Sequence, residues 1–289
     1  MSCLSPERLC PLRAELIIVD VPFLGGFYMQ FDFKDARYNR QENMPEWGED
    51  RQKRLRTASV AVIGAGGVKS TLLMALAAGG IGRIGVVEFD TVELSNLNRQ
   101  ILYRTSDIGM LKGVAAHKTL SDLNPEITID LIEKKITKNN IDEVLDEYEL
   151  IVEGGESPDG RNTVNEYCLR QGKPMVHASA QFSYGYVFSM IPAKKSACFA
   201  CLFPDDHSRV EHTGPVPVNV LSTSLAGSLG AAEVFKWFLG YQDAMYFNKR
   251  MTFSSLLLSG VFNVDEVARR EDCEYCSRSN FSERPDHEI

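Results

Sequence analysis

The chain has 289 residues, of which 44% are hydrophobic, and its formal net charge is −8 at pH 7. This length supports a full hydrophobic core and predicts one large domain with appendages. The negative charge excludes a broad nucleic-acid-binding face, and no hydrophobic run is long enough to span a membrane. The first residues lack the apolar core of a signal peptide, so we expect a cytoplasmic protein that binds neither nucleic acid nor membrane.

Two short apolar runs begin the chain, at residues 14–20 and 27–33, on either side of a glycine-containing turn. They predict a hairpin. One interpretation is an arm that packs against the core or a dimer partner; the other is a ribbon whose open edge grips a substrate peptide as an added strand. We therefore expect an N-terminal hairpin at residues 1–45 and a main domain at residues 46–289, which opens with a charged, solvated helix.

The main domain is organised around a glycine-rich turn. A β-branched run at residues 60–63 predicts a buried parallel strand, and residues 70–78 predict a helix. Between them lie Gly64, Gly66 and Gly67. In this geometry backbone N–H groups approach a phosphate, and the helix N-terminus adds partial positive charge. The alternative is a tight strand-to-helix turn that binds nothing.

A polar segment follows the second predicted strand. Residues 83–88 are mostly apolar and end in Glu88, which is placed to accept hydrogen bonds from ribose hydroxyls. Simple dinucleotide-binding domains have no polar, amide-rich run like the one at residues 89–100. Its candidate nucleotide-binding side chains are Asp90, Ser95, Asn96 and Arg99.

Helices and strands alternate through the rest of the chain. The fold class we expect is α/β, with a Rossmann-like, mostly parallel sheet continued by antiparallel strands. His177 lies on a short strand, where we interpret it as a hydrogen-bonded structural histidine. The predicted helices are at residues 112–123, 141–148, 162–171 and 219–239, and the predicted strands are at residues 127–132, 150–152, 174–178 and 183–191, the last of them antiparallel.

Four of the seven cysteines form two CxxC pairs, Cys198 with Cys201 and Cys273 with Cys276. Four thiolates at this spacing suit a closed tetrahedral zinc site, which has no open position for water and is therefore structural. Such a site would staple the C-terminal segment to the sheet. Disulfides or a redox pair are the alternatives, and a reducing compartment disfavours both.

Three motifs in this order resemble the ThiF/MoeB/HesA family, the bacterial relatives of ubiquitin-activating enzymes. They are Arg-Tyr-Asn-Arg-Gln at residues 37–41, Gly-Ala-Gly-Gly-Val at residues 64–68 and Ser-Asn-Leu-Asn-Arg at residues 95–99. The resemblance extends over roughly residues 37–276. It implies an enzyme that binds ATP and Mg and adenylates a carboxylate.

The resemblance also implies roles for single residues. Arg40 matches an arginine that reaches the ATP of the partner subunit, which implies a homodimer with shared sites. Glu88 stands at the ribose-binding acid, with Asp90 beside it, and Glu156 stands where the family usually has the Mg-binding Asp. The catalytic roles fall to Arg40, Arg99, Lys112 and Glu156, and the nucleotide-binding roles to Gly64, Gly66, Gly67, Glu88, Asp90, Ser95, Asn96, Arg99 and Lys112.

This chain departs from the family pattern in three places. Lys69 replaces the last glycine of the loop, where its cation could crowd the turn or add a phosphate or carboxylate contact. Glu156 is one methylene longer than the usual Asp, which could shift or weaken the Mg position. No cysteine lies between Cys201 and Cys273, the region from which thioester-forming members take their nucleophile. We therefore expect the reaction to stop at the adenylate or to pass it to another nucleophile.

These observations leave three functional hypotheses. In the first, the enzyme resembles the microcin-type peptide-modifying branch and adenylates a carboxylate of a ribosomally made precursor peptide. A nucleophile of the same peptide then captures the activated carboxylate, as a step of antibiotic biosynthesis. In the second, it adenylates the C-terminal glycine of a ubiquitin-like sulfur-carrier protein. In the third, it is a nucleotide-binding scaffold without catalysis, which Lys69 and Glu156 favour.

Overall fold

The computed structural model describes residues 16–19, 27–30, 36–154, 158–203, 216–256 and 262–277. It divides into two units, Met1–Gln52 and Lys53–Ile289. In the first unit, β1 (Leu16–Val19) and β2 (Phe27–Gln30) pair antiparallel, as the predicted hairpin requires. Two helices follow these strands, α1 (Asn39–Glu42) and α2 (Gly48–Thr57).

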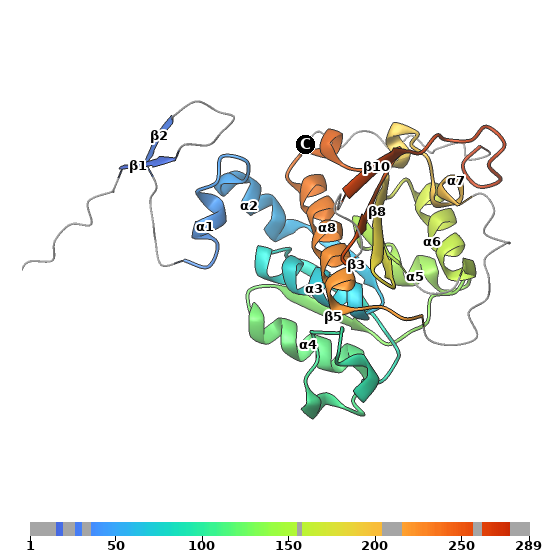
Figure 1. The fold of residues 1–289 in the computed structure, drawn as a ribbon, viewed down its shortest axis with the longest axis horizontal. Coiled ribbons are helices and arrows are strands. Elements are labelled where there is room, and N and C mark those ends of the chain that lie inside the picture. Colours follow the sequence, from blue (N-terminus) through green and yellow to red (C-terminus); the bar gives the residue numbers. More distant parts are fainter. Residues whose placement is uncertain are drawn as a thin grey trace, which may run out of the picture. The chain divides into compact units, whose positions relative to one another are not determined.

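The second unit is built on one sheet of eight strands in the order β10-β9-β8-β7-β6-β3-β4-β5 (Figure 1). The strands β5, β4, β3, β6 and β7 pair parallel, and from β7 to β10 every pairing is antiparallel. The predicted fold class is therefore confirmed. The strands are β3 (Ser59–Ile63), β4 (Arg83–Val87), β5 (Thr128–Ile132), β6 (Leu150–Glu153), β7 (Met175–Gln181), β8 (Tyr184–Met190), β9 (Lys249–Ser254) and β10 (Phe262–Glu266).

Helices cover both faces of the sheet. Figure 1 shows α3 and α8 side by side across one face, where Gly230 of α8 lies against Ala178 of β7. The adjacent residue of β7, His177, points to the other face and packs on Phe199 of α7. The helices are α3 (Gly67–Gly79), α4 (Lys112–Leu123), α5 (Ile141–Leu145), α6 (Pro158–Gln171), α7 (Phe199–Leu202) and α8 (Val220–Phe238), with 3-10 turns η1 (Leu94–Asn96), η2 (Thr105–Asp107), η3 (Pro192–Lys194) and η5 (Gln242–Ala244).

Small residues let α8 approach α3 closely, as the composition of its sequence suggests. A Cβ on Gly227 would lie 2.4 Å from the carbonyl O of Val68, so a side chain there would push the two helices apart. Asn219 caps the helix, its side chain accepting the N–H of Ser222 at 3.0 Å. The apolar surface between these helices and the sheet is fully buried, including Leu72 and Leu76.

Several predicted boundaries move. The helix predicted to end at residue 148 ends at Leu145, and Tyr148 instead donates its hydroxyl to Asp130 at 2.7 Å. The helix expected from residue 162 begins at Pro158, and the sequence analysis did not predict β9 or β10. Within the described ranges, no helix combines the length and hydrophobicity that a membrane span needs.

Candidate active site

The glycine-rich turn joins β3 to α3 at the carboxyl edge of the parallel strands. Gly64 has φ +86°, a left-handed conformation that disfavours side chains, and Gly66 is the N-cap of α3. Within the described ranges no side chain caps the helix, so the first N–H groups of α3 point out of the turn without a local side-chain acceptor. These groups and the helix dipole make an anion-binding position.

Glu88 lies against this turn. Its buried carboxylate accepts hydrogen bonds from the backbone N–H groups of Ala65 at 2.8 Å, Phe89 at 2.8 Å and Asp90 at 3.0 Å. The Tyr103 hydroxyl donates to the carbonyl of Ala65 at 2.7 Å from the other side. Glu88 therefore clamps the turn as well as lying where a ribose-binding acid is expected, and Tyr103 is a supporting residue that the sequence analysis missed.

The amide-rich run folds beside the glycines. Asn96 is buried in η1, where its Oδ1 accepts the N–H of Glu93 at 3.1 Å. The Arg99 guanidinium donates to the carbonyl O of Ser95 at 2.9 Å. A Cβ on Gly67 would meet Arg99 at 3.4 Å and Thr223 of α8 at 2.8 Å, so a side chain at this position would displace one of them. The turn and the polar run thus form one continuous surface.

Lys112 is held at the same edge. It is the first residue of α4, and its backbone N–H donates to the carbonyl O of Asp90 at 2.8 Å. Its Nζ lies 3.3 Å from the Asp90 carboxylate, with the lysine buried and the aspartate exposed. The pair keeps a cation in place near the turn, and an exposed carboxylate is a partner that a more highly charged phosphate can replace.

The roles of two predicted catalytic residues stay predictions. Glu156 lies outside the described residues, and Arg40 is an exposed residue of the first unit. Gln100 is an additional polar residue near the turn: its amide nitrogen would lie 3.9 Å from a Cβ on Gly66, and its buried Oε1 has no partner in the described part of the chain. Its place in the amide-rich run was the only signal for it in the sequence.

A buried polar network lies on the opposite side of the turn. His177 has both ring nitrogens bonded, Nδ1 to Glu153 at 2.8 Å and Nε2 to the hydroxyl of Tyr186 at 2.7 Å. Burial lowers the pKa of His177, although the hydrogen bond with Glu153 opposes the shift. A neutral ring can donate from Nδ1 to the carboxylate and accept the Tyr186 hydroxyl proton at Nε2. The interpretation of His177 as a structural histidine fits these contacts.

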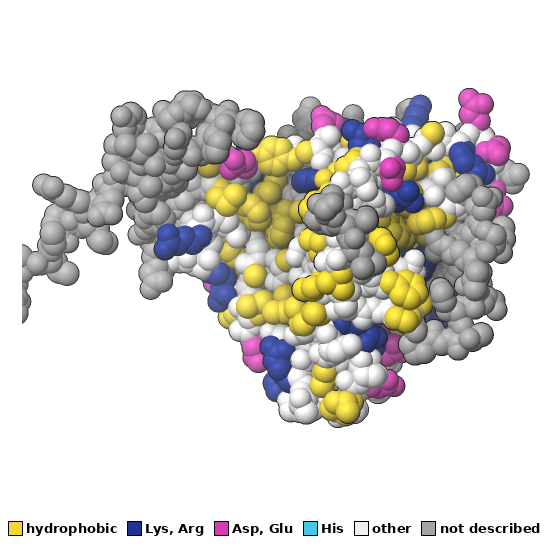
Figure 2. Space-filling model, in the orientation of Figure 1, with side chains coloured by type: hydrophobic (Ala, Val, Ile, Leu, Met, Phe, Trp, Pro, Cys, Tyr) yellow, Lys and Arg dark blue, Asp and Glu magenta, His cyan; other side chains and the backbone are white. Residues whose placement is uncertain are grey.

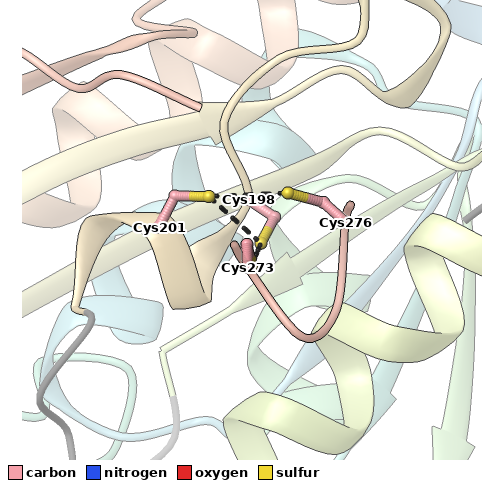
Figure 3. Close-up of side chains that lie close together, drawn as sticks. All are labelled: Cys198, Cys201, Cys273 and Cys276. Carbon is pink, nitrogen blue, oxygen red and sulfur yellow. Dashed lines mark hydrogen bonds between the residues drawn. The ribbon is translucent and has the colours of Figure 1, made fainter. Parts of the chain in front are cut away.

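The four cysteines come together as predicted (Figure 3). Their sulfur atoms all lie within 4.8 Å of one another, and three pairs are 3.5, 3.6 and 3.9 Å apart. A tetrahedron with Zn–S bonds of about 2.3 Å has sulfur–sulfur edges of about 3.8 Å, so the arrangement fits zinc. Hydrogen bonds from Cys198 and from the backbone N–H of Arg270 lower the pKa of Cys201, which favours the thiolate that a metal binds.

Comparison with known proteins identifies the family. The sequence profile of the ThiF family matches residues 38–275. The chain belongs to the ThiF family. It is 38% identical over 214 residues to the sulfur carrier protein adenylyltransferase of Thermus thermophilus, a match that covers 71% of this chain and 78% of that protein. The chain is therefore an ATP-dependent adenylyltransferase, and the scaffold hypothesis is not supported.

Other similar proteins differ from this chain in length. The adenylyltransferase and sulfurtransferase MOCS3 of Culex quinquefasciatus is 32% identical over 244 residues, and the match covers 84% of this chain and 55% of that relative. This chain thus spans about half the length of that relative. The crystal structure of E. coli MccB with ATP superimposes with a TM-score of 0.74 at 25% identity, over 84% of this chain and 74% of MccB. PaaA, at 22% identity and a TM-score of 0.68 over 82% of this chain and 86% of PaaA, shares the fold.

Proposed function

We propose that this ThiF-family enzyme adenylates the C-terminal carboxylate of a small ubiquitin-like carrier protein. The observation that carries the proposal is the 38% identity to the Thermus sulfur carrier protein adenylyltransferase across 78% of its length. The motifs in the sequence favoured a precursor peptide over a carrier protein as the substrate, and this identity reverses that order. Attack of the carboxylate oxygen on the α-phosphorus of ATP forms an acyl-adenylate and breaks the bond to the β-phosphate, so that pyrophosphate leaves.

The site residues divide this chemistry between them. Lys112 and Arg99 neutralise phosphate charge, Asn96 orients the phosphates, and Glu88 takes the ribose. Glu156 is the proposed ligand of Mg, which would draw charge from the phosphates during the transfer. Catalysis by these groups consists of positioning and charge neutralisation.

A protein substrate agrees with the open edge of the sheet. β10 is one of the two edge strands, and all five of its residues are exposed. Phe262 is 53% exposed and Val264 52% exposed, on an edge that can accept a partner strand. Hydrophobic side chains also spread over much of the face that carries α3 and α8 (Figure 2). Such surfaces suit a folded partner that delivers its C-terminus to the glycine turn.

We propose further that this chain forms no thioester. Four cysteines belong to the proposed zinc site, and Cys168 is fully buried in α6, where burial raises the pKa of its thiol. A nucleophilic cysteine needs exposure and a lowered pKa. An enzyme with Cys3, Cys10 and Cys168 all changed to Ser should keep its turnover; loss of product with normal pyrophosphate exchange would show a thioester step.

The substrate is tested by ATP–pyrophosphate exchange. We expect exchange that depends on a β-grasp carrier protein ending in Gly-Gly and falls when the last glycine is removed, because the attacking carboxylate of the shortened chain lies one residue further from the α-phosphorus. A carrier of equal size with an amidated C-terminus is the matched control. The proposal would be contradicted if none of the tested carrier proteins, including any encoded beside the gene, supports exchange.

A precursor peptide is the second candidate. The structural likeness to MccB, at 25% identity, and the absence of a cysteine between Cys201 and Cys273 favour it. Incubation of the enzyme and ATP with candidate peptides, followed by mass spectrometry, distinguishes the two substrates. ATP-dependent dehydration or cyclisation of a peptide, with no carrier-dependent exchange, would favour the peptide.

A further inference from the structure

Lys69 is a buried ammonium group with one hydrogen-bond acceptor among the described residues. Its side chain starts in the first turn of α3 and the residue is 3% exposed. Nζ donates to the carbonyl O of Ala178 at 3.2 Å, and no other acceptor or ion pair reaches it among the residues that the structure describes. An ammonium has three donors, so two N–H groups are left over. A buried charge with unmade hydrogen bonds is unfavourable unless something completes its shell.

Another buried lysine of the same chain shows what a satisfied ammonium looks like. Lys173 is 7% exposed, and its Nζ donates to three backbone carbonyls: Leu145 at 2.9 Å, Asp146 at 2.6 Å and Tyr148 at 2.8 Å. All three of its donors are thereby filled, as expected of a lysine with a purely structural task. Lys69 has two fewer hydrogen-bond acceptors than Lys173 in the described part of the chain. It stands at the position where the family pattern has the last glycine of the loop.

The surroundings of Lys69 are suited to an anion. The ammonium lies beside the end of β6, since a Cβ on Gly154 would be 2.2 Å from Nζ, and beside the end of β7 through Ala178. Glu153 attracts the ammonium, and Arg161 is a second cation that acts at the same position. The N-terminus of the 13-residue helix α3 adds positive potential from the same side.

The position differs from the proposed nucleotide contacts. Glu88 and Lys112 lie on the β4 side of the glycine turn, whereas Lys69 reaches the β6–β7 side. We propose that Lys69 forms an oxyanion-binding position on the β6–β7 side of the turn, where its two remaining N–H groups bind oxygens of the acceptor carboxylate or of a nucleotide phosphate. The inference rests on the proposed function for the nature of the acceptor. It makes Lys69 a binding residue that this chain has in place of a glycine.

The test compares binding of defined probes to the full-length wild type, Lys69→Met and Lys69→Gly. Methionine keeps the apolar stem without the charge, and glycine restores the usual loop residue. The probes are inorganic pyrophosphate, MgATP, a peptide ending in Gly-Gly with a free carboxylate, and the same peptide amidated, each titrated by calorimetry. We expect both variants to bind at least one oxyanion probe about 10-fold more weakly, because two charge-assisted hydrogen bonds are lost.

The pattern of losses identifies the oxyanion. Weaker binding of the free-carboxylate peptide alone assigns the position to the acceptor, and weaker binding of pyrophosphate and MgATP assigns it to the phosphates. Lys173→Met is the matched control; it should lower the thermal midpoint without changing any affinity, because its ammonium bonds the backbone carbonyls of Leu145, Asp146 and Tyr148 and not a residue of the glycine turn. The thermal midpoint of Lys69→Met should not fall, since a buried charge with open donors is removed while the apolar stem is kept.

Affinities within twofold of wild type for every probe in folded Lys69 variants would overturn the inference, as would a wild type that binds none of them. Failure of the proposed function gives a different result. In that case wild type shows no carrier-dependent exchange, while binding of pyrophosphate or MgATP still depends on Lys69.

Discussion

Three buried lysines show how one residue type takes three tasks in this enzyme. The ammonium of Lys173 donates to backbone carbonyls, and Lys112 pairs with the exposed Asp90. Lys69 has one hydrogen bond, of 3.2 Å, within the described part of the chain. Burial by itself therefore does not indicate the function of a lysine. The number and kind of hydrogen-bond acceptors around its ammonium group do. Glu88 gives the same lesson among the acids, because its carboxylate supports the glycine turn through three backbone N–H groups.

Replacing Lys112 by Ala should lower ATP–pyrophosphate exchange about 10²-fold or more, because a positioned cation that stabilises phosphate charge is lost. Lys118→Ala is the matched control, since Lys118 lies exposed on the same helix α4. Exchange rates measured with both variants at saturating ATP check the prediction. Near-normal exchange by Lys112→Ala would show that the phosphates bind elsewhere.

The stability of the fold should depend on pH through Lys69. Burial lowers the pKa of Lys69 from 10.5 to about 8, against the opposing charge of Glu153. Between those two values the unfolded chain holds a proton that the folded chain has released, so the free energy of unfolding rises with pH in that window. Relative to Lys69→Met, the wild type should gain up to roughly 3 kcal/mol from pH 8 to pH 10.5. Urea denaturation of both proteins across this range measures the difference, and parallel profiles would refute it.

At the scale of elements, the cysteine pairs join two distant parts of the chain. Cys198 is the N-cap of α7 and Cys201 lies within its single turn, and Cys273 and Cys276 follow β10. The aromatic residues next to the first pair, Phe199 and Phe203, pack together on the sheet face that holds His177. A metal at this point would therefore fix the segment after β10 against the same face as α7.

We expect one zinc per chain in protein purified under reducing conditions, because four clustered thiols at tetrahedral spacing match its preference. Cys276→Ser should lose the metal and lower the thermal midpoint by about 10 °C or more, since the binding free energy of a structural metal stabilises the fold. Cys168→Ser is the control and should keep its zinc. Metal analysis by mass spectrometry decides; a zinc-free wild type would contradict the assignment.

At the scale of the whole molecule, the chain consists of two units, and the proposed site residues are divided between them. Arg40 belongs to the first unit, while the glycine turn and Lys112 belong to the second. The family resemblance places an arginine of this motif at the ATP of a partner subunit. We therefore propose a homodimer whose two sites each use residues from both chains.

Mixing Arg40→Ala chains with Lys112→Ala chains should restore activity. Each homodimer lacks one essential cation in both sites, whereas a heterodimer has one site with both cations intact. Differently tagged chains, co-purified and assayed for pyrophosphate exchange, give the measurement, with each variant alone as the baseline. Verified heterodimers as inactive as their parents would exclude a shared site.

Local spacing in the sequence was enough to predict the glycine turn, the α/β fold class, the antiparallel strand after β7 and the two cysteine pairs. Period, turn residues and metal-ligand spacing act over a few neighbouring positions, so a linear reading detects them. Tertiary structure alone decided which distant residues meet. Tyr103 supports Ala65 across 38 positions, and Lys69 reaches Ala178 across 109. Whether a buried ammonium has enough hydrogen-bond acceptors depends on groups that only the folded chain brings near it. The sequence therefore shows Lys69 as a departure from a motif, and the folded chain shows which acceptors it has.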